Sequence, residues 1–125
     1  MGLQILAVDD SRTIRDMLKL ALLQAGFEPR LAEDGMHGLE VLERMVPDAI
    51  ITDINMPRMD GFGFIEAVRG QERHRATPIL VLTTESAPEL KARARAAGAT
   101  GWIVKPFDPE KLVKALRTVA GPGAA

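Results

Sequence analysis

The chain has 125 residues, 46% of them hydrophobic, which supports a single folded domain with its own core and argues against intrinsic disorder. Its 16 basic and 17 acidic residues leave a net charge of −1, without the basic excess typical of nucleic-acid-binding proteins, and the absence of cysteine excludes disulfides and thiolate metal sites. No apolar stretch approaches the roughly 18 residues of a membrane span, and the N-terminus lacks the basic segment of a secretion signal, so we expect a cytoplasmic protein without membrane contacts.

Short apolar runs alternate with segments of helical periodicity from the N-terminus onward. Residues 3–8 form the first apolar run and predict a strand, and residues 14–25 then repeat apolar side chains at helical spacing up to Gly26. Glycine tolerates the left-handed conformation that commonly ends a helix. The next run, residues 27–32, contains Pro29, which suits an edge strand because no ladder hydrogen bond is lost there.

The middle of the chain repeats this order. Asp34 is placed to cap a helix over residues 35–45. Residues 49–52 are almost fully apolar, as expected of a buried parallel strand, and a loop over residues 54–60 follows. Asp60 is placed to cap the next helix. This part of the chain therefore predicts a helix, a buried strand and a second helix.

The last third of the chain predicts two more strands and two more helices. Residues 78–83 form an apolar strand after a polar connector, and residues 86–89 read Ser-Ala-Pro-Glu, which predicts a capping box at the start of the fourth helix. That helix is rich in alanine, with Leu90 as its one large apolar residue, so we expect it to be the least firmly anchored helix. Residues 101–104 form the fifth strand, and the last helix begins at Asp108.

This alternation places the chain in the α/β class, with a doubly wound sheet of five parallel strands and five helices on its two faces. We assign residues 1–120 to one domain and residues 121–125, which are all small, to a flexible tail. The histidines His37 and His74 have no ligand-like spacing, and we expect both at the surface.

Polar side chains follow four of the five predicted strands. They are Asp9, Asp10, Asp53, Thr83, Thr84 and Lys105. Ligands of such sheets bind beyond the carboxyl ends of the strands, so we expect these groups to lie together. Three neighbouring carboxylates repel one another unless a cation joins them, and Mg²⁺, with Mn²⁺ as a substitute, prefers oxygen ligands. An ammonium group and a hydroxyl beside them would bind the oxygens of a phosphoryl group.

Asp53 is the carboxylate that we expect to react, because it follows a buried strand and precedes a loop whose carbonyls can face a metal ion. Other interpretations stay open for single residues. Asp53 would then be only a third metal ligand, Asp10 or Ser11 a helix cap, Thr83 an ordinary strand residue and Lys105 a solvated charge. Their joint occurrence at the strand ends favours a metal-assisted phosphoryl site over coincidence.

Four short motifs at these strand ends resemble the response-regulator receiver domain, and the resemblance spans about residues 3–120. The motifs are Val8-Asp9-Asp10-Ser11, Asp53-Ile54-Asn55-Met56-Pro57 with Asp60-Gly61, Leu82-Thr83-Thr84, and Lys105-Pro106-Phe107. Within the family, residues 83–85 and 102–107 are similar to the stand-alone chemotaxis proteins of the CheY type. The resemblance implies a flavodoxin-like sheet with strand order 2-1-3-4-5.

The resemblance also implies a reaction. Asp53 would accept phosphate from the phosphohistidine of a histidine kinase. Asp10, Asp53 and the backbone carbonyl of Asn55 would coordinate Mg²⁺ directly, with Asp9 acting through water. The chain would not be an enzyme, apart from catalysing its own dephosphorylation.

The family's switch implies further roles. The Thr83 hydroxyl would move toward the phosphoryl group, the backbone of Thr84 would donate to it, and Lys105 would bind one of its oxygens beside a cis peptide bond to Pro106. Trp102 lies at the position of a switch aromatic, and it fits a packed core tryptophan equally well.

Two residues and several partners complete what the resemblance implies. Asn55 and Glu85 would tune spontaneous dephosphorylation and give a phosphoryl state that lasts seconds to minutes. The partners would be a sensor histidine kinase, a phosphatase, and an output protein, such as the flagellar motor switch, on the face made by the fourth helix, fifth strand and fifth helix. We expect a monomer that controls chemotaxis by protein contact. The alternatives are a phosphoryl shuttle in a relay, a receiver fragment of a larger regulator and, more remotely, an aspartate-nucleophile phosphatase.

Overall fold

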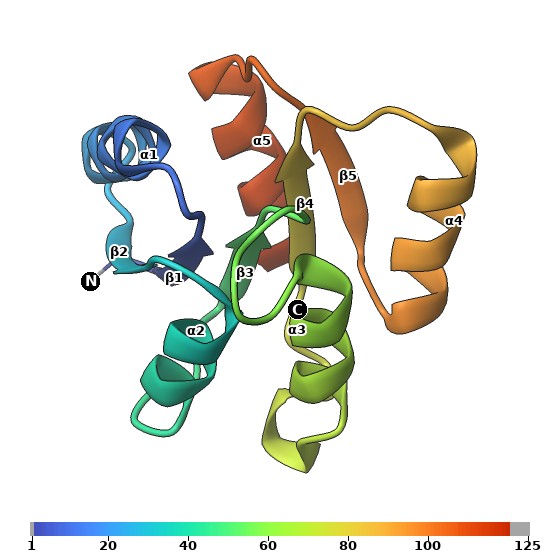
Figure 1. Ribbon diagram of the computed structural model, residues 1–125. Coiled ribbons are helices and arrows are strands. Elements are labelled where there is room, and N and C mark those ends of the chain that lie inside the picture. The colour runs from blue at the N-terminus through green and yellow to red at the C-terminus, as the bar shows by residue number, and fades with distance from the viewer. Residues whose placement is uncertain (1, 121–125) are drawn as a thin grey trace.

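The five apolar runs form the five strands of one parallel sheet, with helices on both of its faces (Figure 1). The computed structural model describes residues 2–120, so the predicted tail, 121–125, lies outside the described residues. The strands are β1 (Gln4–Val8), β2 (Glu28–Ala32), β3 (Ala49–Thr52), β4 (Ile79–Thr83) and β5 (Gly101–Val104). The helices are α1 (Arg12–Gln24), α2 (Gly35–Leu42), α3 (Gly61–Arg69), α4 (Pro88–Ala97) and α5 (Pro109–Ala120), with a 3₁₀ turn, η1 (Glu72–His74), before β4.

The strands lie in the order β2-β1-β3-β4-β5, which confirms the predicted fold class and strand order. β3 is central, since it pairs with β1 on one side and with β4 on the other. Successive side chains of a strand point to opposite faces, so Ile50 packs in the core beneath α2, α3 and α4, whereas Ile51 packs in the core beneath α1 and α5. The apolar run of β3 is continuous because helices cover both faces of the sheet.

The sequence signals at strand and helix ends are largely confirmed. β2, which contains Pro29, lies at one edge of the sheet and pairs with β1. The N-caps of α1, α2 and α3 are Ser11, Asp34 and Asp60, whose side-chain oxygens accept backbone amides at 3.3, 2.8 and 2.8 Å. Gly26 follows α1 with a φ of 87°, in the left-handed region.

The predicted capping box at residues 86–89 is wrong. α4 begins at Pro88, its N-cap is Ala87, and no side chain caps it. The residue before a proline is disfavoured in the helical region, and Ala87 accordingly has an extended backbone. Ser86 would need Ala87 as the first helical residue in order to act as the cap, so Pro88 shifts the helix start one residue beyond its reach.

Helix α2 is shorter than predicted, because it ends at Leu42 rather than at residue 45. The side chain of Arg73 donates a hydrogen bond to the Leu42 carbonyl. That carbonyl therefore already has a partner from η1, and the chain turns away through Glu43.

The prediction that His74 lies at the surface is wrong, since its exposed fraction is 0%. His74 belongs to η1 and is held from both sides: Arg73 Nε donates to its ring at 3.2 Å, and Arg69 Nη1 donates to its carbonyl at 2.8 Å. Burial lowers the pKa of His74. His37 is half-buried, and its Nδ1 accepts the Glu33 amide at 3.1 Å. The connector gave no periodic signal that could have predicted the burial of His74.

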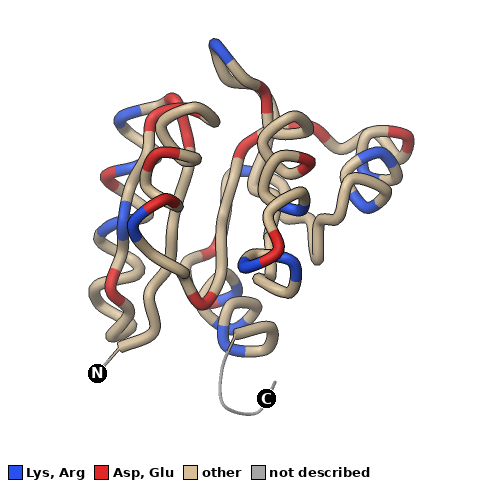
Figure 2. Tube along the Cα trace, turned by 90° about the horizontal axis from the view of Figure 1, so that it is seen from below, with Lys and Arg blue, Asp and Glu red and all other residues tan. Residues whose placement is uncertain are grey.

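α4 buries little, as expected, because Ala94 is its one buried residue; its weak anchoring stays a prediction. Figure 1 shows α4 at the side of the molecule next to β5. Figure 2 shows acidic and basic positions interspersed along the helices, in keeping with the balanced composition. Within residues 2–120, no helix is long and apolar enough to cross a membrane.

Candidate functional site

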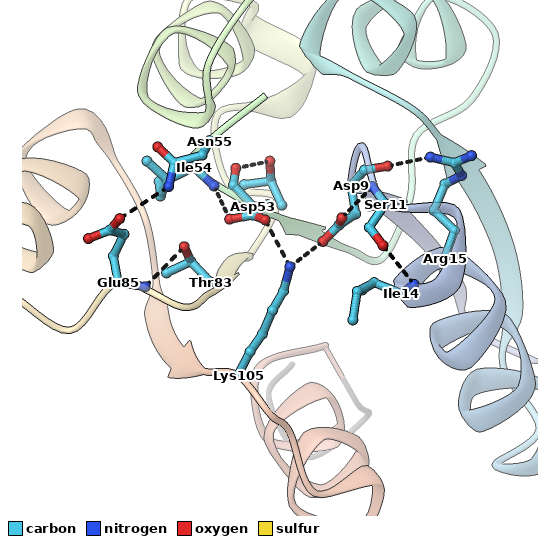
Figure 3. A network of polar contacts seen from close by, with 11 residues as sticks. Asp9, Ser11, Ile14, Arg15, Asp53, Ile54, Asn55, Thr83, Glu85 and Lys105 are labelled. Atoms are coloured by element: carbon cyan, nitrogen blue, oxygen red, sulfur yellow. Dashed lines mark hydrogen bonds and ion pairs between the residues drawn. The ribbon is translucent and has the colours of Figure 1, made fainter. Parts of the chain in front are cut away.

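The site lies at the carboxyl ends of the central strands, where a lysine joins two aspartates. Asp9 directly follows β1, Asp53 follows β3 and Lys105 follows β5. Lys105 Nζ donates to Asp9 Oδ2 and to Asp53 Oδ2, each at 2.8 Å, and points between the two carboxylates (Figure 3). Because β4 separates β5 from β3, Lys105 reaches across the end of β4 to make these contacts. The solvated-charge interpretation of Lys105 is therefore wrong.

Three carboxylates form an acidic cluster at this edge. One carboxylate oxygen of each of Asp9, Asp10 and Asp53 lies within 4.8 Å of the others. Asp9 and Asp53 are buried, with exposed fractions of 1% and 8%, whereas Asp10 is exposed and leaves the cluster open to solvent. Hard oxygen donors gathered on one open side fit a divalent cation such as Mg²⁺. The cluster can therefore hold a metal ion that enters from the side of Asp10.

Burial and charge act in opposite directions on the pKa of Asp9 and on that of Lys105. Burial raises the pKa of Asp9, against the lowering effect of its hydrogen bonds from Lys105 and the Ser11 amide. Burial also lowers the pKa of Lys105, but the hydrogen bonds and negative charges of Asp53 and Asp9 outweigh it, so the pKa is raised overall. Lys105 is therefore cationic at neutral pH and places its positive charge between the two buried side chains.

Both oxygens of Asp53 have fixed partners. Its Oδ1 accepts the Ile54 amide at 2.6 Å, and its Oδ2 accepts Lys105. The Asp53 amide donates to the Val8 carbonyl at 3.0 Å, which extends the β1–β3 pairing to the site. The backbone of Asp53 is therefore fixed at the end of the sheet, and its carboxylate is held in one orientation.

Gly61 is a residue whose role the sequence interpretation missed. The motif Asp60-Gly61 assigned it no role, but a Cβ there would lie 2.2 Å from the Asp53 carbonyl oxygen. The Gly61 amide also donates to the Ile54 carbonyl at 2.8 Å, so the loop after β3 closes directly onto the end of β3. A glycine in the first turn of a helix beside an Asp cap was the available signal.

Glu85 links the remaining predicted site residues. Its carboxylate accepts Asn55 Nδ2 at 3.2 Å, its amide donates to the buried Thr83 hydroxyl at 3.4 Å, and its carbonyl accepts Trp102 Nε1 at 3.0 Å. Trp102 is half-buried against the core beneath α2, α3 and α4. Thr84 is exposed next to this group. The structure brings Asn55 and Glu85 together as a pair, and both interpretations of Trp102 remain compatible with its position.

Arg15 is a second residue that the sequence interpretation missed. Its Nη1 donates to the Asp9 carbonyl at 2.8 Å, and the Ser11 amide donates to Asp9 Oδ1 at 2.9 Å (Figure 3). Arg15 lies one turn after the cap Ser11, so the helical spacing from Ser11 was the signal that could have found it. These contacts hold the turn that carries the first two aspartates.

Comparisons with known proteins agree with this geometry. A family model described as the response regulator receiver domain matches residues 5–117. The chemotaxis protein CheY1 of Helicobacter pylori is 37% identical over 123 residues, which cover 95% of this chain and 98% of that protein.

Solved structures show the same likeness. The chemotaxis protein CheY4 of Vibrio cholerae is 50% identical, with a TM-score of 0.92 and coverage of 95% of this chain and 99% of that one. The receiver domain of a sensor histidine kinase from Pseudomonas aeruginosa, solved with a magnesium ion coordinated in its active site cleft, is 29% identical with a TM-score of 0.90. That alignment covers 97% of this chain and 99% of the other.

Proposed function

The chain belongs to the response regulator receiver domain family, and from this premise we propose that it is phosphorylated on Asp53 by a histidine kinase and signals through protein contacts. Receiver domains of two-component systems are signalling proteins rather than enzymes with their own substrates. The observation that supports Asp53 is its place within the acidic cluster and beside Lys105, buried and with both oxygens oriented.

The residues around Asp53 suit a divalent metal ion. Asp10, Asp53 and the backbone carbonyl of Asn55 would coordinate Mg²⁺, with Asp9 acting through water. When bound, the ion supplies positive charge to the oxygens of the entering phosphoryl group. The magnesium in the related kinase receiver domain supports this assignment. Mn²⁺ would serve as a substitute because it prefers the same oxygen ligands.

The chemistry of Asp53 itself is a phosphoryl transfer. One carboxylate oxygen attacks phosphorus as the phosphorus–nitrogen bond of the donor's phosphohistidine breaks, and the released imidazole takes a proton from solvent. The product is an acyl phosphate on Asp53. Lys105, already 2.8 Å from Asp53 Oδ2, then donates to a phosphoryl oxygen. The backbone amide of Thr84 would donate to another.

Phosphorylation would change the conformation of the output face through Thr83 and Glu85. The Thr83 hydroxyl accepts the Glu85 amide at 3.4 Å, a long contact that Thr83 can give up as it turns inward and donates its hydroxyl to a phosphoryl oxygen. Glu85 also holds the indole of Trp102, and α4 begins three residues later with little buried area. A shift of Glu85 would therefore change Trp102 and α4 together, which makes the face of α4, β5 and α5 the output surface.

Asn55 and Glu85 form an exposed hydrogen-bonded pair beside Asp53 (Figure 3). We expect this pair to tune the rate at which the chain removes its own phosphoryl group and to give a phosphoryl state that lasts seconds to minutes. A phosphatase would act on the same exposed side. Self-dephosphorylation is the one catalytic act that we assign to this chain.

Chemotaxis is the biological role that the relatives favour. CheY1 and CheY4 are both chemotaxis proteins, and each aligns with this chain over nearly its full length. The output partner would then be the flagellar motor switch. The kinase receiver domain from Pseudomonas favours a second candidate, a receiver that passes phosphate within a relay or belongs to a larger regulator.

The proposal predicts that acetyl phosphate, a small phosphodonor, labels the protein on Asp53 when Mg²⁺ is present. Intact-mass spectrometry should show one added phosphoryl group, which chelation of the metal with EDTA should abolish. Asp53→Asn should stay unlabelled while keeping the circular dichroism spectrum of the parent.

Equal labelling of the parent and of Asp53→Asn would reject Asp53 as the acceptor. Steady hydrolysis of a phosphate ester such as p-nitrophenyl phosphate would instead favour the remote alternative, an aspartate-nucleophile phosphatase.

A further inference from the structure

The loop between β3 and α3, residues 54–60, has an unusual conformation at its tip. Arg58 has a φ of 66°, and it is the one non-glycine residue with positive φ in the described part of the chain. The Met59 amide donates to the Pro57 carbonyl at 2.7 Å, so Arg58 is the central residue of a γ-turn. A γ-turn with positive φ is strained for a residue that carries a side chain. Contacts elsewhere must therefore hold the tip in place.

Arg58 makes such a contact with the start of α2. Its Nε and Nη2 donate to Asp34 Oδ2 and Oδ1 at 2.8 and 3.0 Å, a two-point ion pair between residues 24 positions apart. The Asp34 side chain is only 6% exposed, whereas that of Arg58 is 55% exposed. Exposed ion pairs contribute little as a rule, but a two-point arginine–carboxylate pair defines geometry as well as energy. The hydrogen bonds from Arg58 lower the pKa of Asp34, which keeps that carboxylate charged.

A second contact packs the tip of the loop against the start of α2. A Cβ on Gly35 would lie 2.9 Å from Met59 Cγ and 3.0 Å from the Met59 carbonyl oxygen. The chain therefore approaches α2 closely at the residue after Arg58, and the absence of a side chain at Gly35 permits this approach. The loop is fixed at its tip by α2 and at its base by the bond between Gly61 and Ile54.

We propose that Arg58 and Asp34 are positioning residues for the metal site, because their ion pair fixes the loop that carries the backbone carbonyl of Asn55. This inference rests on the proposed function, in which that carbonyl is a metal ligand. A carbonyl on a loop held at both ends is already oriented before the cation arrives, so little ordering is needed on binding.

The direction in which metal affinity changes when Arg58 is removed distinguishes a positioning role from a purely electrostatic one. Arg58 is a cation, so removing it would by itself strengthen the binding of another cation at the acidic cluster. If Arg58 positions the loop, its removal weakens that binding instead. Residues that orient metal ligands from outside typically change metal affinity by about 10-fold to 100-fold when they are lost. Because the Arg58 side of this ion pair is exposed, we expect a loss of Mg²⁺ affinity near the lower end of this range, at about tenfold.

The test is isothermal titration of the metal-free full chain with Mg²⁺, for the parent and a set of variants. Arg58→Ala and Asp34→Asn should each weaken binding about tenfold, since asparagine keeps the helix cap but loses the charge. The double variant should be no weaker than either single one, because both remove the same contact. Arg58→Lys, which keeps the charge and one contact, should recover part of the loss. Arg44→Ala, an exposed arginine just after α2, is the matched control and should change nothing.

A readout without metal checks the mechanism itself. In the metal-free protein, hydrogen exchange at the Met59 amide should be faster in Arg58→Ala than in the parent, with α3 unchanged. Unchanged or tighter Mg²⁺ binding by Arg58→Ala, in a parent that binds the ion, would overturn the positioning role alone. A parent that binds no Mg²⁺ would overturn the proposed metal site, and this inference with it.

Discussion

Helices α3 and α4 are neighbours on one face of the sheet, but they are attached to it in different ways. α3 buries five residues, Gly61, Phe62, Phe64, Ile65 and Val68, whereas α4 buries Ala94 alone. The first turn of α3 also closes onto the strand that carries Asp53. α3 is therefore anchored to the sheet by more buried side chains than α4, and under the proposed function α4 would be the helix that responds to the site.

Polar contacts from α3 take the place of apolar burial in holding α4. Arg69 of α3 donates through Nε and Nη2 to the Gly98 carbonyl, at 3.0 and 2.8 Å, just beyond the end of α4. Arg93 of α4 places its guanidinium 4.0 Å from the centroid of the Phe62 ring. Contacts of this kind can be exchanged at lower cost than a packed core, as the proposed shift of α4 would require.

Truncation of a core residue in each helix gives the sharpest contrast. Phe64→Ala should lower the free energy of unfolding by about 3–5 kcal/mol, because it leaves a cavity in a fully buried place. Leu90→Ala should cost only about 1 kcal/mol, since Leu90 is half-buried. Urea denaturation of both variants measures the difference. Similar losses would mean that α4 is anchored as firmly as α3.

Removal of the Arg69 tether should have an intermediate effect that is concentrated in α4. Arg69→Ala leaves the Gly98 and His74 carbonyls without their charged donor, at a cost of about 2 kcal/mol. Hydrogen exchange should speed up in α4 while α3 stays protected. Arg75→Ala, an exposed arginine, is the matched control. Equal acceleration in both helices would show that Arg69 stabilises the fold globally instead.

A fall in pH should have the smallest effect on the free energy of unfolding. It should act through His74, between α3 and β4. The pKa of His74 is lowered from its usual 6.5 by burial, so the unfolded chain binds the proton more tightly. The stability from neutral His74 is thus fully present above pH 6.5 and is lost as pH falls through the lower folded pKa, by at most about 1.4 kcal/mol per pH unit.

Urea denaturation from pH 8 to pH 5 measures this slope. It should flatten in His74→Gln and persist in His37→Gln. A slope that is unchanged in His74→Gln would assign the pH dependence to other groups.

The fold was predictable because its signals are local and repeat along the chain. Apolar runs of strand length alternate with helical periodicity, and Pro29, Asp34 and Asp60 mark an edge and two helix starts by their own backbone and side-chain chemistry. The end of each strand also points to Asp9, Asp53 and Lys105 as neighbours once the sheet is parallel. The roles of these residues in phosphoryl transfer stay predictions.

The errors and omissions have two physical causes: competition between local signals, and contacts between residues that are distant in sequence. Pro88 outweighed the Ser and Glu of a local capping pattern. His74 is buried in the folded chain, where its neighbour Arg73 reaches the carbonyl of Leu42 in α2. Glu85 became a link between strands only through contacts from Asn55 and Trp102.

The amino-acid sequence alone determined the class of fold, the order of its elements and the strand ends at which reactive groups gather, because spacing and local propensity decide these. Only the tertiary structure decided that Lys105 reaches over β4 to two acids and that Arg58 meets Asp34. Such contacts depend on how separate segments pack in space. No local pattern in the chain encodes the distance between residues on different segments.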